Sequence, residues 1–228
     1  LDLAGTGTAA TADWHVLNLG TVRWLSGGVS FNSRALGSRF TNANLFEIHG
    51  DSSWSYSFGG PNPTFRNEGL VRKVNGTGNT TFQNITFENL GVIEAATGTL
   101  FLPATFTHTA GILRPTGGSI GSQNSFDVAG GTLEGSGTIL RAQFVSGLIS
   151  PGGDATGDLR FPTGLILNPA VTVRIHANGT APGTQHDRLR VAGPVDLGGA
   201  SLQIPAATGI GFGQSALFLE NDGTDPIL

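Results

Sequence analysis

Hydrophobic and polar residues alternate in a repeated pattern along the first half of the chain. In one copy a phenylalanine, an asparagine, a glycine and an aliphatic residue stand at every second position, as Phe87, Asn89, Gly91 and Ile93. The same order occurs at residues 65–71, and looser copies occupy residues 40–46 and 16–22. Because alternate residues of a strand point to one face, each copy predicts two short strands with a bend at the glycine.

The repeat length indicates the architecture that these strands build. Successive copies start 22 to 25 residues apart, a period too short for a propeller blade and without helical spacing. Downstream the asparagine is lost, but an apolar anchor persists at Phe106, Phe126, Phe144 and Phe161. This pattern predicts an all-β fold, a parallel β-solenoid in the form of a right-handed β-helix of about eight or more coils.

The pattern divides the chain into two regions. Residues 1–161 are expected to form the solenoid, with coils of 18–25 residues. Afterwards the alternation continues, for example in Val171, Val173 and Ile175, but between longer loops. Residues 162–228 therefore predict either further, less regular coils or a small separate β-domain.

The repeated asparagine is expected to point into the stack of coils. Neighbouring coils lie about 4.8 Å apart, so each side-chain amide can bond its copy in the next coil, as in the amide ladders of cross-β stacks. The predicted structural ladder consists of Asn18, Asn42, Asn67 and Asn89.

A second row carries charges of alternating sign and is expected to face water. Opposite charges on neighbouring strands contribute about 0.2 to 1 kcal/mol per pair and help to fix the register. The predicted outward charge ladder consists of Arg23, Glu47, Arg72 and Glu94, and Arg66 should lie beside Glu88 in the same way.

Aromatic residues alternate along one further predicted strand, at Trp54, Tyr56 and Phe58. On an outward face this stripe would be a candidate contact for sugar rings or a partner, whereas on an inward face it would cap the core. Trp14 and Trp24 are expected in the core or in caps.

Composition narrows the classes of function. The 36 glycines and the 12% of charged residues favour strands and turns. The absence of cysteine excludes disulfides, thiolate metal sites and cysteine nucleophiles. A net charge of -4 with dispersed Lys and Arg argues against nucleic acid or an anionic membrane surface as the partner. No apolar run is long enough for membrane insertion by this segment.

Motifs that carry catalysis are missing. The chain lacks the zinc-protease, nucleophile-elbow and phosphate-loop patterns. Glu47 and Glu94 share a face, but carboxylates paired with arginines make poor general acids. His186 and Asp187 are adjacent, yet no serine motif supports them as a catalytic pair. We therefore expect no catalytic residues and a protein that is not an enzyme.

Acidic residues at predicted turns are candidate calcium ligands. They form two pairs, Asp154 with Asp158 and Asp222 with Asp225. Neither pair follows the helix-loop pattern of known calcium loops, and the calcium-binding nonapeptide is missing. The expectation is therefore no metal and no cofactor, with calcium as the single candidate.

Four segments carry a likeness to known repeats: FRNEGLVRKVNGTGNTTFQNITFENLGVIEAATGTLFL, GGTLEGSGTIL, GLISPGGDATGDLRF and HDRLRVAGPVDLGGASLQI. In this order they resemble the repeats of bacterial surface β-helix proteins of the autotransporter-passenger and large-adhesin type. The resemblance covers about residues 65–204. Members of this family often have Tyr before the Asp of the last segment, where this chain has His186.

The resemblance implies a place on the bacterial cell surface or in the extracellular medium. It implies a non-enzymatic structural or adhesive segment of a fibrous protein, acting as a stalk, an adhesin or a filament subunit. The expected partners are further segments of the same polypeptide or identical chains stacked end to end, together with surface polysaccharide. The alternatives are a polysaccharide-processing β-helix enzyme and a glycan-binding or ice-binding module.

Overall fold

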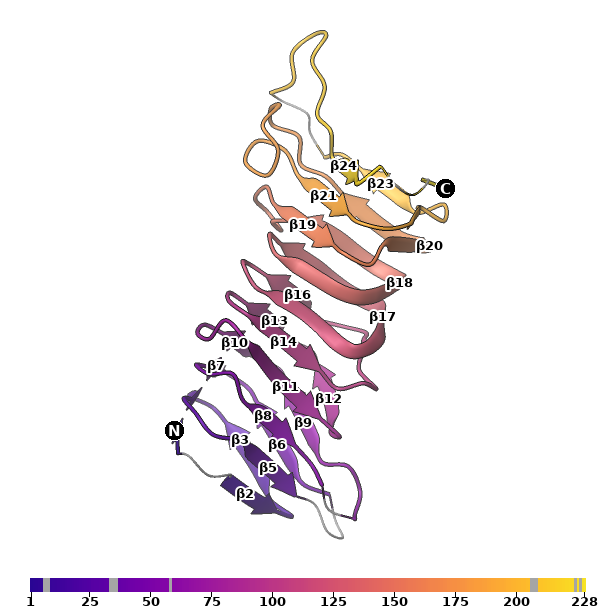
Figure 1. The fold of residues 1–228 in the computed structure, drawn as a ribbon. Coiled ribbons are helices and arrows are strands. Elements are labelled where there is room, and N and C mark those ends of the chain that lie inside the picture. Colours follow the sequence, from indigo (N-terminus) through magenta and orange to yellow (C-terminus); the bar gives the residue numbers. More distant parts are fainter. Residues whose placement is uncertain (6–8, 33–36, 58, 206–208, 224, 226) are drawn as a thin grey trace.

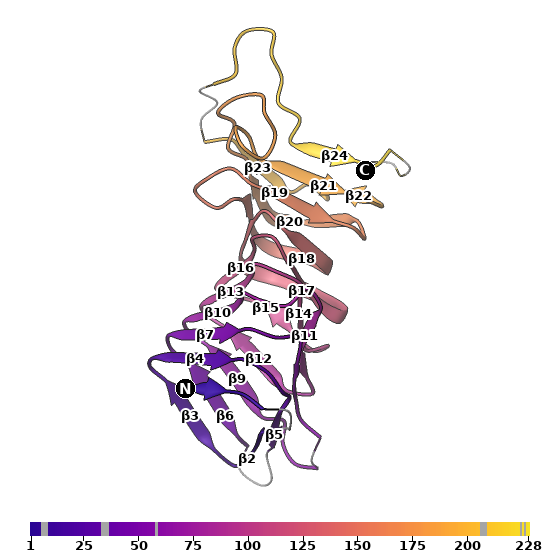
Figure 2. The ribbon, with the colours of Figure 1, turned by 60° about the vertical axis from the view of Figure 1, so that its left-hand side comes forward.

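Short strands of alternately buried and exposed residues wind into a parallel β-solenoid in the computed structural model (Figure 1). The two termini lie at opposite ends of an elongated molecule (Figures 1 and 2). The structure describes residues 1–5, 9–32, 37–57, 59–205, 209–223, 225 and 227–228, with only the backbone of residues 9–12 and 32. Within these ranges every regular element is a strand, and no helix is long and apolar enough to cross a membrane.

Each coil contributes strand segments to three faces, which we number in the order in which the chain visits them. The first face begins with β1 (Asp2–Leu3), β4 (Thr21–Trp24), β7 (Leu45–Ile48), β10 (Leu70–Lys73), β13 (Val92–Ala95) and β16 (Ile112–Pro115). It continues through the ends of β17 (Ser119–Gly135), β18 (Thr138–Pro151) and β20 (Leu165–Arg174) to β23 (Ser201–Gln203).

The second and third faces are built in the same way. The second comprises β2 (Ala9–Ala12), β5 (Val29–Asn32), β8 (Ser53–Ser55), β11 (Asn79–Gln83), β14 (Thr99–Leu102), the starts of β17 and β18, β19 (Asp158–Phe161), β21 (Arg188–Val191) and β24 (Leu219–Asn221). The third comprises β3 (His15–Asn18), β6 (Arg39–Asn42), β9 (Thr64–Asn67), β12 (Thr86–Asn89), β15 (Thr107–His108), the middle of β17 and of β18, the start of β20, and β22 (Val195–Asp196).

All the strand pairs of these faces are parallel, and they link coils rather than residues close in sequence. β17, β18 and β20 each cover more than one face, because the strand continues through the corners of these coils. Glycine at the earlier corners permits close stacking, because a Cβ atom at Gly91 would lie 2.0 Å from the Gly69 carbonyl oxygen. The strands after residue 162 pair in parallel with those before it, for example Asp158 with Arg188.

Inward side chains form one continuous core along the stack. Its first coils are aromatic, and Phe40, Phe65 and Phe87 stack with ring centroids 5.0 and 4.9 Å apart. Such offset stacks add to the stability that burial itself provides. Trp24 joins this core, but the expectation for Trp14 is wrong, because its exposed fraction is 58%.

The downstream phenylalanines are all buried, but they do not form the single row of anchors that the spacing indicates. Phe126 pairs with Ala142, whereas Phe144 pairs with Val128 and Leu167. Phe161 lies on the second face, in register with Val191. The cause is the irregular coil length, which moves phenylalanine from one face to another while keeping it inside.

Candidate functional site

The asparagine ladder runs through the corner between the third and the first face. The Nδ2 atoms of Asn18, Asn42 and Asn67 donate to the Oδ1 atom of the next asparagine at 2.7, 2.9 and 2.7 Å, ending at Asn89. Each also donates to a backbone carbonyl of the following coil, at Leu45, Leu70 and Val92. All four side chains are buried. The predicted ladder is therefore present, and its buried amides bond one another and backbone carbonyls.

The charge ladder is present in register, but it is longer and less exposed than the sequence pattern indicates. Arg23, Glu47, Arg72 and Glu94 stand opposite one another on successive strands of the first face. The row extends to Asp2 at one end and to Arg114 and Glu134 at the other.

One member of this row is covered by its neighbours on the outer side of the face. The Glu94 side chain is only 10% exposed, since Arg72 contacts it at 2.9 Å and Arg114 at 3.6 Å. Arg114 also binds Glu134 at 2.6 Å. The guanidinium groups of neighbouring coils cover the carboxylate, so Glu94 lies on the outer side of the face as predicted but does not face water as expected. These groups neutralise one another and leave little charge to act on a substrate.

Two buried polar residues lie outside the repeat pattern and were not singled out. His108 is fully buried on β15, and burial lowers the pKa of its imidazole to about 4, although the backbone carbonyls of Gly111 and Thr132 favour protonation. Lys73 interrupts the inward row of the first face between Ile48 and Ala95. Only a polar residue at an apolar repeat position could have signalled either of them.

The ammonium group of Lys73 is satisfied entirely by oxygen atoms. Nζ donates to Asp51 Oδ1 at 2.7 Å, to Asn75 O at 3.0 Å, to Thr80 Oγ1 at 3.1 Å and to Gly50 O at 3.3 Å. The hydrogen bond from Lys73 keeps the pKa of Asp51 below its ordinary value, against the opposing effect of burial. A buried charge with this many partners holds the local turns together.

The aromatic stripe does not form an exposed contact. Trp54 and Tyr56 are 2% and 5% exposed, and Trp54 packs against Phe40 and Phe65 in the core. Phe58 lies outside the described residues. The candidate contact for sugar rings is therefore wrong for Trp54 and Tyr56, because alternation points them inward.

The two acidic candidates at the turn before β19 differ in their surroundings. Burial opposes ionisation of Asp158, but hydrogen bonds from Arg190 and Arg188 outweigh it and hold the pKa of Asp158 below its ordinary value. Asp158 is thus engaged by guanidinium groups rather than open to calcium. Asp154 is exposed, and the described residues contain no group of three or more acidic or histidine side chains placed for a metal ion.

His186 and Asp187 are both buried and face different partners. Asp187 accepts hydrogen bonds from the backbone N–H groups of Gly157 and His176, both at 2.7 Å, and its Oδ2 lies 3.0 Å from His176 Nδ1. Burial raises the pKa of Asp187 despite these bonds. The ring nitrogens of His186 face the carbonyls of Gly179 and Leu217. The two residues therefore hold the loop between β20 and β21 against its neighbours.

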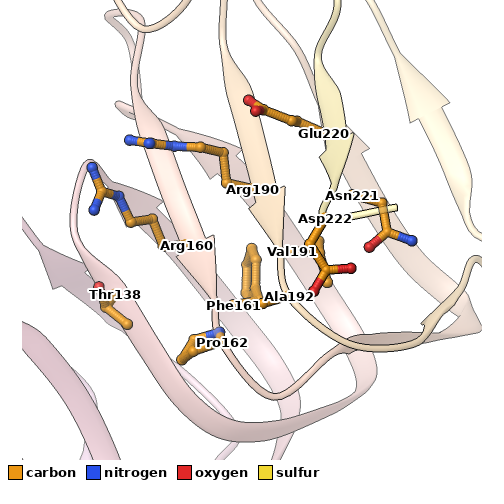
Figure 3. Close-up of a pocket in the computed structure, with 10 residues that line it drawn as sticks. All are labelled: Thr138, Arg160, Phe161, Pro162, Arg190, Val191, Ala192, Glu220, Asn221 and Asp222. Carbon is orange, nitrogen blue, oxygen red and sulfur yellow. The ribbon is translucent and has the colours of Figure 1, made fainter. Parts of the chain in front are cut away.

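A hollow lies on the outer side of the second face, over β19, β21 and β24 (Figure 3). Its volume is about 440 Å³. Arg160, Arg190 and Glu220 project along one side of it, and Asp222 lies on the other (Figure 3). Pro162 and Ala192 lie between these sides, and neither has a long side chain to fill the space.

The two arginines that line this hollow differ in their ionic partners. Arg190 donates to Asp158 from Nε at 2.8 Å and from a terminal nitrogen at 2.6 Å. The side chain of Arg160 is exposed and has no hydrogen bond or ion pair with any described residue. Sequence analysis missed this site, because register between these coils could not be read across their unequal loops. No family model, curated protein or solved structure matches the chain.

Proposed function

We propose that this chain is a non-enzymatic structural and adhesive segment of a bacterial cell-surface or secreted fibrous protein. Its proposed role is to form a stiff rod that holds other segments away from the cell or that adheres to a surface. Its proposed partners are further segments of the same polypeptide or identical chains stacked end to end, and surface polysaccharide.

One observation carries the proposal: the polar residues in register are used to join one coil to the next. The asparagine ladder links coils through buried amides, and the charge row links them through paired carboxylates and guanidinium groups. Such rows resist slippage of the register and stiffen the stack. A rod is the shape that a spacer requires.

The carboxylates support the same proposal against the polysaccharide-processing alternative. That chemistry requires an acid and a base or nucleophile about 5 to 9.5 Å apart in one groove. Glu94 is instead enclosed by Arg72 and Arg114, and Asp187 is fully buried under backbone donors. These contacts favour a structural use of the acidic groups.

Surface labelling of the cells that make the protein tests the proposal. An antibody against the exposed turn at residues 75–79 should label intact cells or the material that they release. Labelling that appears only after permeabilisation would contradict it.

Small-angle scattering of the isolated chain should give the profile of a rod. Reproducible cleavage of pectic, alginate or glucan polymers, abolished by Glu94→Gln, would favour the enzyme instead.

A further inference from the structure

Two outward rows run side by side along the second face, and residues of both rows line the hollow of Figure 3. The polar row follows the strand register through Asn79, Thr99, Ser119, Thr138, Arg160, Arg190 and Glu220. The apolar row lies two residues further along each strand and comprises Phe101, Leu140, Pro162 and Ala192, with the buried Gly121 between the first two. At about 4.8 Å per coil, the polar row from Asn79 to Arg190 spans roughly 24 Å.

The polar row differs from the charge row of the first face in the order of its charges. On the first face every neighbouring pair from Asp2 to Glu134 has opposite signs. In the polar row Arg160 stands directly opposite Arg190, although like charges in this position repel each other. Arg190 shares the carboxylate of Asp158 with Arg188, which also binds Glu220, whereas the side chain of Arg160 has no hydrogen bond or ion pair with any described residue. An anion bound beside Arg160 would neutralise its guanidinium group and reduce the repulsion between the two arginines.

The surroundings of Arg160 indicate what kind of anion fits. A planar guanidinium group binds a carboxylate through two parallel hydrogen bonds. Glu220 and Asp222 line the same hollow, so a polymer with a charge on every unit would meet repulsion there. The hydroxyl groups of Thr99, Ser119 and Thr138 can bond sugar hydroxyls, and the apolar row can contact the C–H faces of the rings.

We infer that this two-row stripe binds a polysaccharide with widely spaced carboxylates, and that Arg160 holds one of them. The inference rests on the proposed adhesive function, because it names the class of ligand to which the rod adheres. Ala192 and Pro162 leave the space that the sugar ring next to this carboxylate occupies.

Calorimetric titration with three oligosaccharides of equal length tests the inference. The probes are a hyaluronan oligosaccharide, which has one carboxylate per two sugars, its carboxyl-reduced form, and a heparin oligosaccharide. The hyaluronan probe should bind, and both other probes should bind about tenfold more weakly. Equal affinity for the reduced form would overturn the role of the carboxylate. Tighter binding of heparin would overturn the preference for spaced charge.

Substitutions locate the site on the second face. Arg160→Gln and Ala192→Leu should each weaken hyaluronan binding about tenfold, the first by removing the cation and the second by filling the hollow. Arg23→Gln removes the same charge from an exposed arginine on the first face and should change affinity less than about twofold. Equal losses in Arg160→Gln and Arg23→Gln would show attraction to the whole protein and overturn the site.

Titration with a poly-glutamate peptide tests whether the ligand is a polysaccharide or an acidic protein. If it binds as tightly as hyaluronan and loses affinity with Arg160→Gln, the polysaccharide assignment is overturned. Failure of all the oligosaccharides to bind would overturn the inference alone, because the rod shape and the surface labelling test the proposed function separately. Circular dichroism of each variant should retain the β-sheet spectrum of the parent chain.

Discussion

His108 occupies, one coil further along, the position that Asn89 holds in the asparagine ladder. A Cβ atom at Gly111 would meet Asn89 Nδ2 at 2.8 Å, and one at Gly131 would meet His108 Nε2 at 2.6 Å. The two side chains thus lie against equivalent glycines of successive coils. An ionisable ring thus occupies the position that follows the amide ladder, which itself ends at Asn89.

The first prediction concerns the effect of acid on stability through His108. The pKa of His108 is about 4 in the folded chain, and an unfolded histidine has a pKa of about 6.5. The unfolded state therefore binds a proton first as pH falls, so stability contributed by this residue is lost between about pH 6.5 and pH 4. The expected loss is about 3 kcal/mol. Chemical unfolding at pH 7 and pH 4 measures it.

A variant isolates this contribution from that of other groups. His108→Asn restores an amide at the ladder position and removes the titrating ring, so its stability should depend less on pH over the same range by about 3 kcal/mol. Equal pH dependence of the variant and the parent chain would contradict the assignment of the low pKa to His108.

The second prediction concerns the hydrogen bonds of the ladder. Asn67→Leu removes the donor to Asn89 Oδ1 and to the Val92 carbonyl, and the acceptor of Asn42 Nδ2. Leaving buried polar groups without partners should lower the free energy of unfolding by about 3 kcal/mol. Asn44→Ala is the control, since Asn44 is exposed and its side chain, among the described residues, bonds only the Leu19 carbonyl. Equal midpoints in urea for both variants would count against the ladder.

The third prediction compares two members of the charge row. Glu94→Gln removes a carboxylate that is only 10% exposed and leaves Arg72 and Arg114 without it. We expect a loss of about 2 kcal/mol in the free energy of unfolding. Arg23→Gln breaks a contact of 3.8 Å between side chains that are both 53% exposed, and it should change stability by less than about 0.5 kcal/mol. The reverse order of these two effects would refute the burial argument.

The fourth prediction concerns the close approach of backbone at the corners. A Cβ atom in Gly91→Ala would lie 2.0 Å from the Gly69 carbonyl oxygen, so the coils must separate. The loss should be about 3 kcal/mol or more. Gly20→Ala meets no atom within 4 Å and should stay within about 1 kcal/mol of the parent. Thermal unfolding of both variants gives the comparison. Unchanged stability of Gly91→Ala would mean that the corners are looser than described.

The repeat made the fold and the ladder predictable, because Asn67 and its copies must all face inward once the strand period is fixed. The position of Glu94 could not be predicted in the same way, since its burial depends on two arginine side chains from neighbouring coils. Trp14 was misplaced because hydrophobicity alone does not say which residues the stack covers. Lys73 and His108 stand at inward positions of the repeat, but their residue types differ from those of the other coils, so the pattern did not mark them as buried.

The hollow beside Arg160 was not predictable for a different reason. It depends on the pairing of Arg160 with Arg190 on neighbouring strands. The chain between these strands includes β20 and the long loop between β20 and β21. The number of residues in a loop does not determine the register of the strands that it connects. Only the pairing itself brings the two guanidinium groups into one row.

The parallel pairing of successive coils also determines how the molecule responds to mechanical tension. Hydrogen bonds between coils, such as those from Val92 to Gly69 and from Ile112 to Gly91, run along the stack rather than across it. A pull on the two ends therefore loads the coils in series, and the weakest junction opens first. Each opening releases the slack of one coil, such as the segment from Glu47 to Arg72, while the others keep their pairing. The rod would thus lengthen in steps and dissipate work under shear.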